Sequence, residues 1–169
     1  MMLIRKATET DHDGVWEIFS EVVKKGDTYV FPDDTPRADL TKYWFAPEMD
    51  TYVAENENGE IVGTYFLKPN HPGRGNHISN AGYMVKPSHQ GKGIGKQLCE
   101  HSIQIAKEAG YLAMQFNIVV STNTAAVRLW QKFGFKIIGT TPKGFQHKEL
   151  GLVDTYVMWR GLEISEVSS

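Results

Sequence analysis

Gln90-Gly91-Lys92-Gly93-Ile94-Gly95-Lys96 is the most informative stretch of this 169-residue chain. It contains three glycines within five residues and opens a pattern typical of a long helix. Glycine leaves the backbone N–H groups of a helix N-terminus uncovered, and the helix dipole favours an anion there. We therefore expect this turn to hold a phosphate group.

The residues of this turn do not fit two common phosphate-binding motifs. Lys96 is followed by Gln97 where the P-loop of nucleotide triphosphatases has Ser or Thr, and the glycine spacing also differs. The dinucleotide fingerprint needs a later third glycine and an N-terminal βαβ unit. The turn instead resembles the pyrophosphate loop of the GNAT superfamily of N-acetyltransferases, Arg/Gln-x-x-Gly-x-Gly/Ala, with Gln90, Gly93 and Gly95 in the named positions.

A second stretch, residues 123–135, resembles the other GNAT signature. Asn123 opens a helix pattern, small residues follow, and an aromatic, Trp130, precedes Gly134-Phe135. The two signatures occur in the family's order and cover about half of the chain. The resemblance implies an α/β fold: one GNAT domain over residues 1–162, with a mixed, mostly antiparallel sheet of about seven strands, splayed central strands and flanking helices. We expect residues 163–169 to form a disordered C-terminal tail.

The composition restricts the class of protein. A formal net charge of −2 gives no field for gripping a polyanion, so we expect no nucleic-acid partner, although Lys86, Lys92 and Lys96 cluster beside the glycine-rich turn. No apolar run reaches membrane-spanning length, and the N-terminus lacks a secretory segment. A cytoplasmic protein without a membrane partner is expected. The single Cys99 lies on an apolar helix face, which favours a buried structural thiol.

Hydrophobic periodicity and turn residues predict the order of the elements. A strand at 3–6 leads into a helix that carries Val15, Ile18, Phe19, Val22 and Val23 at helical spacing. A short helix is expected at 37–43, and Asn58-Gly59 predicts a hairpin between strands at 51–55 and 61–67. The remaining predictions are strands at 77–85 and 112–120, helices at 93–109 and 123–133, and strands at 135–140 and 152–159 joined by a polar loop, 141–151.

The resemblance implies acetyl-CoA as the co-substrate and no metal. In the family, the strand before the glycine-rich turn and the strand after its helix diverge, and the pantetheine arm fills the gap between them. The carbonyl and amide groups of one strand would bind the pantetheine, and the amides of the turn would bind the pyrophosphate. The implied cofactor-binding residues are Met84, Val85, Gln90, Gly91, Lys92, Gly93, Ile94, Gly95, Lys96, Asn123, Ala126 and Lys132.

Acetyl transfer to an amine needs a neutral amine, a polarised thioester carbonyl and a proton or hydrogen bond for the leaving thiolate. The chain departs from the family at two of these points. Trp130 stands where many members carry the tyrosine thought to protonate the thiolate, and the strand at 77–83 lacks the glutamate that often serves as base. Tyr156 and Tyr83 are candidate acids. Candidate bases are His77 and a water relayed by Asn80 or Ser79.

Asn80 and Asn117 lie inside predicted strands, where asparagine is disfavoured. Their surroundings are similar to those of a yeast acetyltransferase that acts on proline-type amino acids. The similarity implies that Asn80 and Asn117 bind the acceptor, and that Asn80 and Asn123 assist catalysis. Equally, such amides can simply satisfy backbone groups. Tyr29 and Phe31 could wall the acceptor site or could only cover the sheet.

The sequence therefore predicts an N-acetyltransferase that moves an acetyl group from acetyl-CoA to the amine of a small, amino-acid-like molecule. Two alternatives stay open: a protein or peptide N-acetyltransferase, and an acyl-CoA-binding sensor without turnover. Dimers are common in the family, so a homodimer is also considered. The identity of the acceptor cannot be read from the sequence.

Overall fold

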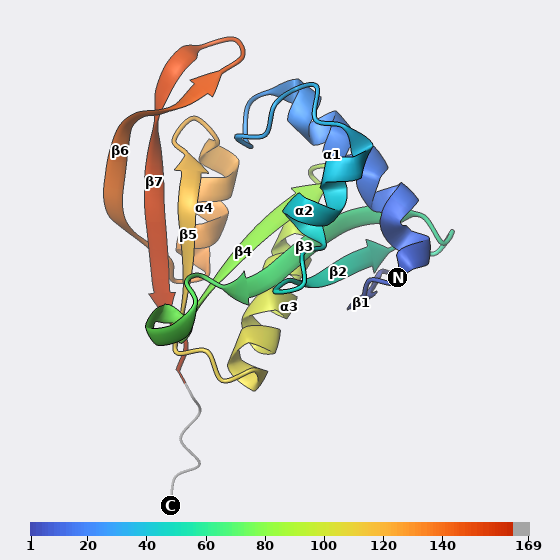
Figure 1. Ribbon diagram of the computed structural model, residues 1–169, viewed down its shortest axis with the longest axis horizontal. Coiled ribbons are helices and arrows are strands. Elements are labelled where there is room, and N and C mark those ends of the chain that lie inside the picture. Colours follow the sequence, from blue (N-terminus) through green and yellow to red (C-terminus); the bar gives the residue numbers. More distant parts are fainter. Residues whose placement is uncertain (164–169) are drawn as a thin grey trace, which may run out of the picture.

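The computed structural model describes residues 1–163 (Figure 1). Of the tail expected at 163–169, all but Glu163 lies outside the described residues. Short 3₁₀ turns occur at Glu9–Asp11 (η1), Arg37–Asp39 (η2), Gly73–Gly75 (η3) and Pro87–His89 (η4). The other elements are β1 (Leu3–Lys6), α1 (His12–Lys25), α2 (Leu40–Trp44), β2 (Asp50–Glu55), β3 (Ile61–Pro69), β4 (Ile78–Val85), α3 (Ile94–Glu108), β5 (Ala113–Val120), α4 (Thr124–Lys132), β6 (Lys136–His147) and β7 (Gly151–Gly161).

The ends of several elements follow from local chemistry. Thr8 and Asp11 form a capping box just before α1. Gly26, with φ of 66°, ends α1, and Gly110, with φ of 86°, follows the end of α3. Gly59, with φ of 76°, makes the tight turn between β2 and β3 that Asn58-Gly59 predicted.

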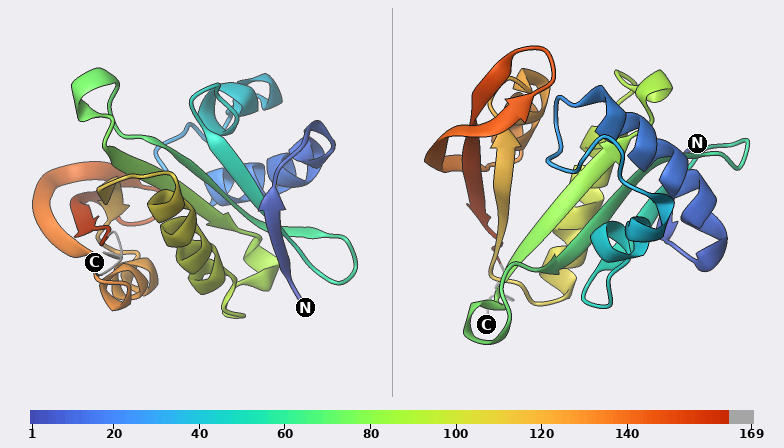
Figure 2. Two further views of the ribbon diagram at one scale, coloured as in Figure 1. Left: turned by 90° about the horizontal axis from the view of Figure 1, so that it is seen from below. Right: turned by 45° about the horizontal axis from the view of Figure 1, so that its top comes forward.

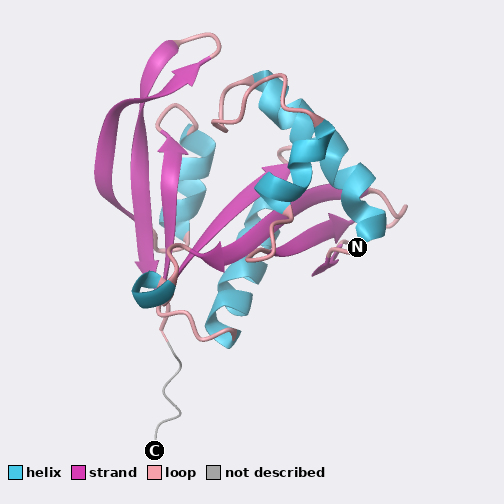
Figure 3. Ribbon diagram, in the orientation of Figure 1, coloured by secondary structure: helices cyan, strands magenta, loops and turns pink. Residues whose placement is uncertain are grey.

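The seven strands form one sheet in the order β1-β2-β3-β4-β5-β7-β6. Helices α1 and α2 cover one face, and α3 and α4 cover the other (Figures 2 and 3). One apolar cluster joins α1 and α2 to the sheet through Phe19, Trp44 and Phe66. The second lies under α3 and α4 and contains Leu98 and the buried Cys99, as predicted. Burial raises the pKa of the Cys99 thiol to about 12, which leaves it unreactive.

The sheet opens between its two central strands. β4 and β5 run parallel, as their helical connection requires, but they pair only over Ile78–Asn80 with Ala113–Gln115. Beyond Asn80 and Gln115 no further pairs join them, and the two strands diverge toward their C-terminal ends (Figure 1). The predicted fold class and its splayed central strands are confirmed.

Two predicted elements differ from the structure. The helix expected at 37–43 begins as the 3₁₀ turn η2 and becomes α-helical only at Leu40. The polar loop expected at 141–151 was wrong, because β6 continues to His147 and pairs with β7 through a register shift between Thr141 and Phe145. Lys143 adopts a positive φ of 55° at this bulge, and Phe145 beyond it is buried. A bulge on an edge strand also accommodates Pro142.

Candidate active site

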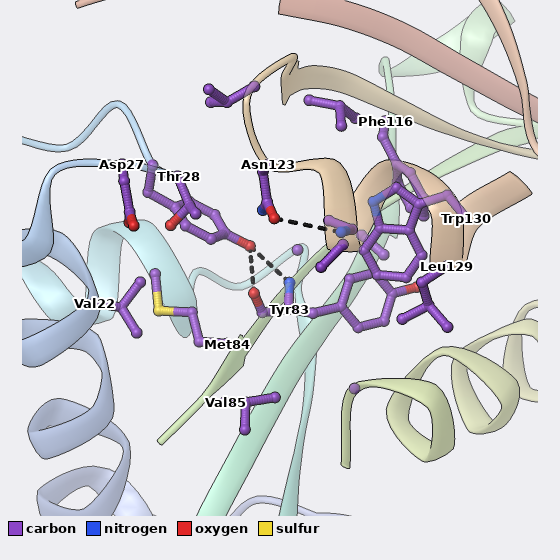
Figure 4. A pocket seen from close by; sticks show the side chains of 18 of the residues that line it. Val22, Asp27, Thr28, Tyr83, Met84, Val85, Phe116, Asn123, Leu129 and Trp130 are labelled. Atoms are coloured by element: carbon purple, nitrogen blue, oxygen red, sulfur yellow. Dashed lines mark hydrogen bonds between the residues drawn. The ribbon is translucent and has the colours of Figure 1, made fainter. Parts of the chain in front are cut away.

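A cavity of about 720 Å³ occupies the gap between β4 and β5. The segment after α1, the glycine-rich turn before α3 and one side of α4 complete its walls. In Figure 4, Asp27 and Thr28 lie on one side, Leu129 and Trp130 lie on the other, and Asn123 lies between them. The volume is within the range of a small-molecule site.

The free edge of β4 is held by Tyr29 from the segment after α1. The Tyr29 hydroxyl accepts a hydrogen bond from the Tyr83 backbone N–H at 2.7 Å and donates one to the Tyr83 carbonyl at 2.7 Å (Figure 4). In an antiparallel pair, residues alternate between facing the partner strand and facing away. Tyr83 and Val85 therefore present their backbone groups to the gap, whereas those of Met84 face Thr64 on β3.

This alternation bears on Met84 and Val85, the pair of residues expected to bind pantetheine. The backbone groups of Val85 face the gap, whereas Met84 turns its backbone groups to β3 and contributes a buried side chain. On the free edge, the residue next to Val85 with backbone groups facing the gap is Tyr83. The Tyr83 side chain is not available as an acid, because its hydroxyl lies 2.6 Å from the Ser102 hydroxyl on the α3 side. Burial raises the pKa of the Tyr83 phenol well above its usual value.

The glycine-rich turn has the open backbone that its sequence indicated. Gly91 and Gly93 have φ near 79° and 78°, and no atom lies within 4 Å of where their Cβ atoms would stand. Gly93 is the N-cap of α3 and brings no side chain to cap the first amides. Gln90, Gly91, Gly93, Ile94 and Gly95 all line the cavity.

The lysines near the turn differ in their surroundings. Lys92 and Lys96 are exposed at the turn without lining the cavity, and Lys132 is exposed at the end of α4. Lys86 is ion-paired with Glu17 at 3.0 Å and with Glu60 at 2.7 Å. The expected basic cluster is therefore reduced to Lys92 and Lys96.

The second signature stretch forms the opposite wall. The Asn123 side chain caps α4 by accepting from the Ala126 N–H at 3.3 Å, and both residues line the cavity. Trp130 packs its ring against Tyr83 at 4.9 Å and against Phe116 at 5.0 Å between centroids. It serves packing, as an indole without an acidic proton should.

The two strand asparagines both line the cavity but have different surroundings. Asn80 donates its side-chain amide to the Gln115 carbonyl at 2.9 Å, at the last paired position before the strands diverge. Asn117 is exposed and donates to the Asn70 side chain at 2.8 Å. Each amide thus has a structural partner, and each still has hydrogen-bonding capacity toward the cavity.

The structure does not bring two of the predicted catalytic residues to the cavity. His77 is exposed and precedes β4, six residues before Tyr83 and so about 20 Å from it along the strand. Tyr156 on β7 pairs with Val119 and Thr140 and packs on the α3 and α4 cluster. Neither residue lines the cavity. The prediction failed because a residue's position in a strand does not reveal at which end the sheet opens.

Sequence reasoning missed Asp27. Among the described residues that line the cavity it supplies the only carboxylate, and its nearest cation, Lys25, lies 3.9 Å away. Lys25, Thr28 and His89 also line the cavity and were missed. The signal for Asp27 was present, because it follows the glycine that ends α1 and precedes Tyr29 in the aromatic segment.

Two further observations concern the described part of the chain. No group of three or more His, Cys, Asp or Glu side chains in residues 1–163 is arranged to hold a metal ion. Within the same residues, no helix has the length and apolar character needed to cross a membrane.

The fold agrees with comparisons to known proteins. The Acetyltransferase (GNAT) family model matches residues 15–135, from α1 to the end of the second signature stretch. The chain belongs to the GNAT family. A solved GCN5-related N-acetyltransferase from Kribbella flavida is 37% identical with a TM-score of 0.91, over 95% of this chain and 98% of that one.

Two curated relatives have longer or comparable chains. N-acetyltransferase aca1 from Schizosaccharomyces pombe is 38% identical over 113 residues, 66% of this chain and 54% of its own length. This chain thus spans about half of aca1. Peptidyl-lysine N-acetyltransferase YjaB from Salmonella typhimurium is 30% identical over 141 residues, 82% of this chain and 86% of its own. None of these names specifies a proline-type acceptor, so that similarity stays a prediction.

Proposed function

We propose that the protein is an N-acetyltransferase that moves an acetyl group from acetyl-CoA to the amine of a small, amino-acid-like molecule. The observation that carries the proposal is the cavity between the diverging β4 and β5, with the uncapped N-terminus of α3 at its edge. A strand edge that has lost its neighbour offers alternating N–H and C=O groups to an amide-bearing chain. A helix N-terminus beside that edge suits a pyrophosphate.

Each requirement of the reaction has a candidate group. The amides of Gly91 to Lys96 take the pyrophosphate, and Val85 takes a pantetheine amide. The Tyr83 N–H polarises the thioester carbonyl after its hydrogen bond to the Tyr29 hydroxyl has broken. Asn123 lies at the opposite wall, near the reacting end of the pantetheine, while Asn80, Asn117, Tyr29 and Phe31 surround the acceptor.

The chemical step is a simple exchange. The neutral acceptor nitrogen forms a bond to the acetyl carbon, the carbon–sulfur bond breaks, and the thiolate of coenzyme A leaves. The nitrogen loses one proton and the sulfur gains one, so no other reactant is needed. An alkyl amine with a pKa near 10 is about one part in a thousand neutral at pH 7, so proton removal must be assisted. A water bound by Asn80, which lines the cavity, can carry this proton to solvent. Ser79 cannot take this part, because it is buried outside the cavity and donates its hydroxyl to the Ala113 carbonyl at 3.1 Å.

The name of YjaB favours a second candidate, acetylation of a lysine in a polypeptide. Against it stands the cavity volume of about 720 Å³, which the pantetheine arm would also occupy and which suits a free small molecule. A third candidate, an acyl-CoA sensor without turnover, is kept because the family's usual acid and base are absent from residues 77–83 and 130.

One experiment separates the three candidates. Acetyl-CoA binding is measured by calorimetry, and coenzyme A release is followed with free amino acids, simple alkyl amines and lysine-containing peptides. Turnover with the free amines supports the proposal, and turnover confined to peptides supports the second candidate. Binding without turnover on any acceptor identifies a sensor, whereas absence of acetyl-CoA binding contradicts the proposal entirely.

A further inference from the structure

The two sides of the divided sheet are joined again above the cavity. The turn between β6 and β7 reaches across to the end of α1 and the segment that follows it (Figures 1 and 2). Among the described residues, the hydrogen bonds that join them all come from one residue of this turn, Lys148. We call them the Lys148 bridge, and they involve Lys148, Lys24, Gly26 and Asp33.

Three contacts make the bridge. The backbone N–H of Lys148 donates to the Gly26 carbonyl at 3.0 Å, and its ammonium donates to the Lys24 carbonyl at 2.8 Å and to Asp33 at 3.2 Å. Lys24 and Gly26 lie at the C-terminal end of α1, where unpaired carbonyls and the helix dipole favour a cation. The ammonium thus binds a site that the helix end provides.

Both sides of the bridge are shaped for close approach. Gly26 has a φ of 66°, and a Cβ placed there would lie 2.8 Å from the Cβ of Lys148. On the other side, His147 accepts hydrogen bonds from the backbone N–H groups of Glu149 and Leu150, both at 3.1 Å. The turn therefore presents Lys148 in a preset shape, and only glycine at position 26 lets it come so near.

The bridge borders the cavity. Lys25, Asp27 and Thr28, on either side of the bridged Gly26, all line the cavity, so the contact fixes the wall that carries its only carboxylate among the described residues. The bridge joins the two sides of the divided sheet beside these residues, so a polypeptide leaving the gap between β4 and β5 on this side would have to pass it. A volume of about 720 Å³ must also hold the pantetheine arm with its acetyl group, which leaves space for a small acceptor.

We propose that Lys148 is a specificity-determining residue, and that its bridge restricts the acceptor to free small amines by closing the groove that a peptide would occupy. The inference rests on the proposed acetyltransferase function. Lys148 acts by positioning the segment at 26–28 and has no part in the chemical step.

The test compares one amine in two settings. Coenzyme A release is measured with a free amino acid and with a peptide of about ten residues that begins with the same amino acid. The wild type should prefer the free amino acid by about 100-fold or more in kcat/KM. Lys148→Ala should reduce this ratio by about tenfold, and Asp33→Asn, which removes one contact only, should reduce it less.

Lys136→Ala is the matched control, since Lys136 is an exposed lysine on β6 outside the bridge. It should leave the ratio unchanged. The inference is overturned if the wild type uses the peptide as well as the free amino acid, or if neither bridge variant lowers the ratio more than the control does. If acetyl-CoA binds and free amines are acetylated, either result leaves the proposed function standing. Failure of the wild type to bind acetyl-CoA or to acetylate any acceptor would remove both.

Discussion

The Tyr29 hydroxyl satisfies both backbone groups of Tyr83 that would face β5 if the sheet were continuous. One side chain from the segment after α1 thus substitutes for a missing strand. Phe31 stacks on the Tyr29 ring at 5.9 Å, and Trp44 contacts it edge-on at 6.0 Å between centroids. Burial raises the pKa of the Tyr29 phenol above its ordinary value of 10.0, so it keeps its proton and remains a donor through the working pH range.

Replacing Tyr29 with phenylalanine tests whether this hydroxyl competes with the thioester. Tyr29→Phe leaves the Tyr83 N–H and C=O without their partner, which should lower the free energy of unfolding by about 1–2 kcal/mol. If the thioester carbonyl accepts the Tyr83 N–H hydrogen bond in the complex, the substitution destabilises only the protein without acetyl-CoA. Calorimetry should then show acetyl-CoA binding about fivefold more tightly to the variant.

Tyr43→Phe serves as the control for this measurement. Tyr43 packs on Phe31 in the same aromatic group, and no hydrogen bond of its hydroxyl is found among the described residues. The control should keep both stability and affinity close to those of the wild type. Weaker binding of acetyl-CoA by Tyr29→Phe would mean that the hydroxyl contacts the co-substrate instead of competing with it.

Gly95→Ala should separate stability from co-substrate binding. A Cβ at Gly95 would make ordinary contacts with Leu129 at 3.7 Å and Val85 at 3.9 Å, so the fold accepts it. Alanine inside a helix is favoured over glycine by about 1 kcal/mol, and thermal unfolding should show a small gain. The added methyl group crowds the cavity beside the first turn of α3, so acetyl-CoA affinity should fall.

Gln97→Ala is the comparison for Gly95→Ala, because Gln97 is exposed on the same helix and does not line the cavity. Its affinity for acetyl-CoA should match that of the wild type. Unchanged affinity in Gly95→Ala would argue against a co-substrate at the start of α3.

Asp27→Asn should weaken the binding of cationic acceptors. A carboxylate next to the acceptor attracts an ammonium group, and losing a charged hydrogen bond of this kind costs about 1.5–3 kcal/mol, or about 10- to 100-fold in KM. Steady-state kinetics with a free amino acid should show this rise in KM with little change in acetyl-CoA affinity. Asp34→Asn, an exposed carboxylate in the same segment, should show neither effect. Equal KM values for the two variants would exclude Asp27 from acceptor binding.

The sequence predicted the elements well wherever one local rule decided them. Asn58-Gly59 marked the hairpin between β2 and β3 because a positive φ is needed there, and residues 90–96 indicated the uncapped helix start through their own composition. The family resemblance added the divergence of β4 and β5. Phe145 shows the limit, since the polar stretch 141–151 predicted a loop, whereas β6 continues through it and buries Phe145.

The site was harder to predict, because it depends on where distant segments meet. Tyr29 and Tyr83 are 54 residues apart, and no local pattern links a hydroxyl to a particular strand edge. His77 shares a strand segment with Asn80 and was equally plausible by residue type, yet it lies at the closed end of the divided sheet. The backbone groups of alternate residues in a strand face opposite sides. The sequence does not show whether those of Tyr83 or those of Met84 face the gap.

The Asp11 carboxylate should make the stability of the protein depend on pH in the acid range. Its buried carboxylate binds the Arg5 guanidinium through two hydrogen bonds of 2.8 Å and accepts the Thr8 N–H at 2.8 Å. These contacts, with Arg5 the largest cause, lower the pKa of Asp11 below its usual value. A carboxyl whose pKa is lower in the folded state stabilises the protein above its unfolded pKa of about 3.9, and this stabilisation is lost as the pH falls through the folded pKa. Asp11→Asn should therefore unfold at a lower urea concentration than the wild type, with a free energy of unfolding lower by about 2 kcal/mol at pH 7. This difference in free energy should shrink below about pH 4. A deficit that stays the same from pH 7 to pH 3 would show that packing, and not the carboxylate charge, carries the contribution of Asp11.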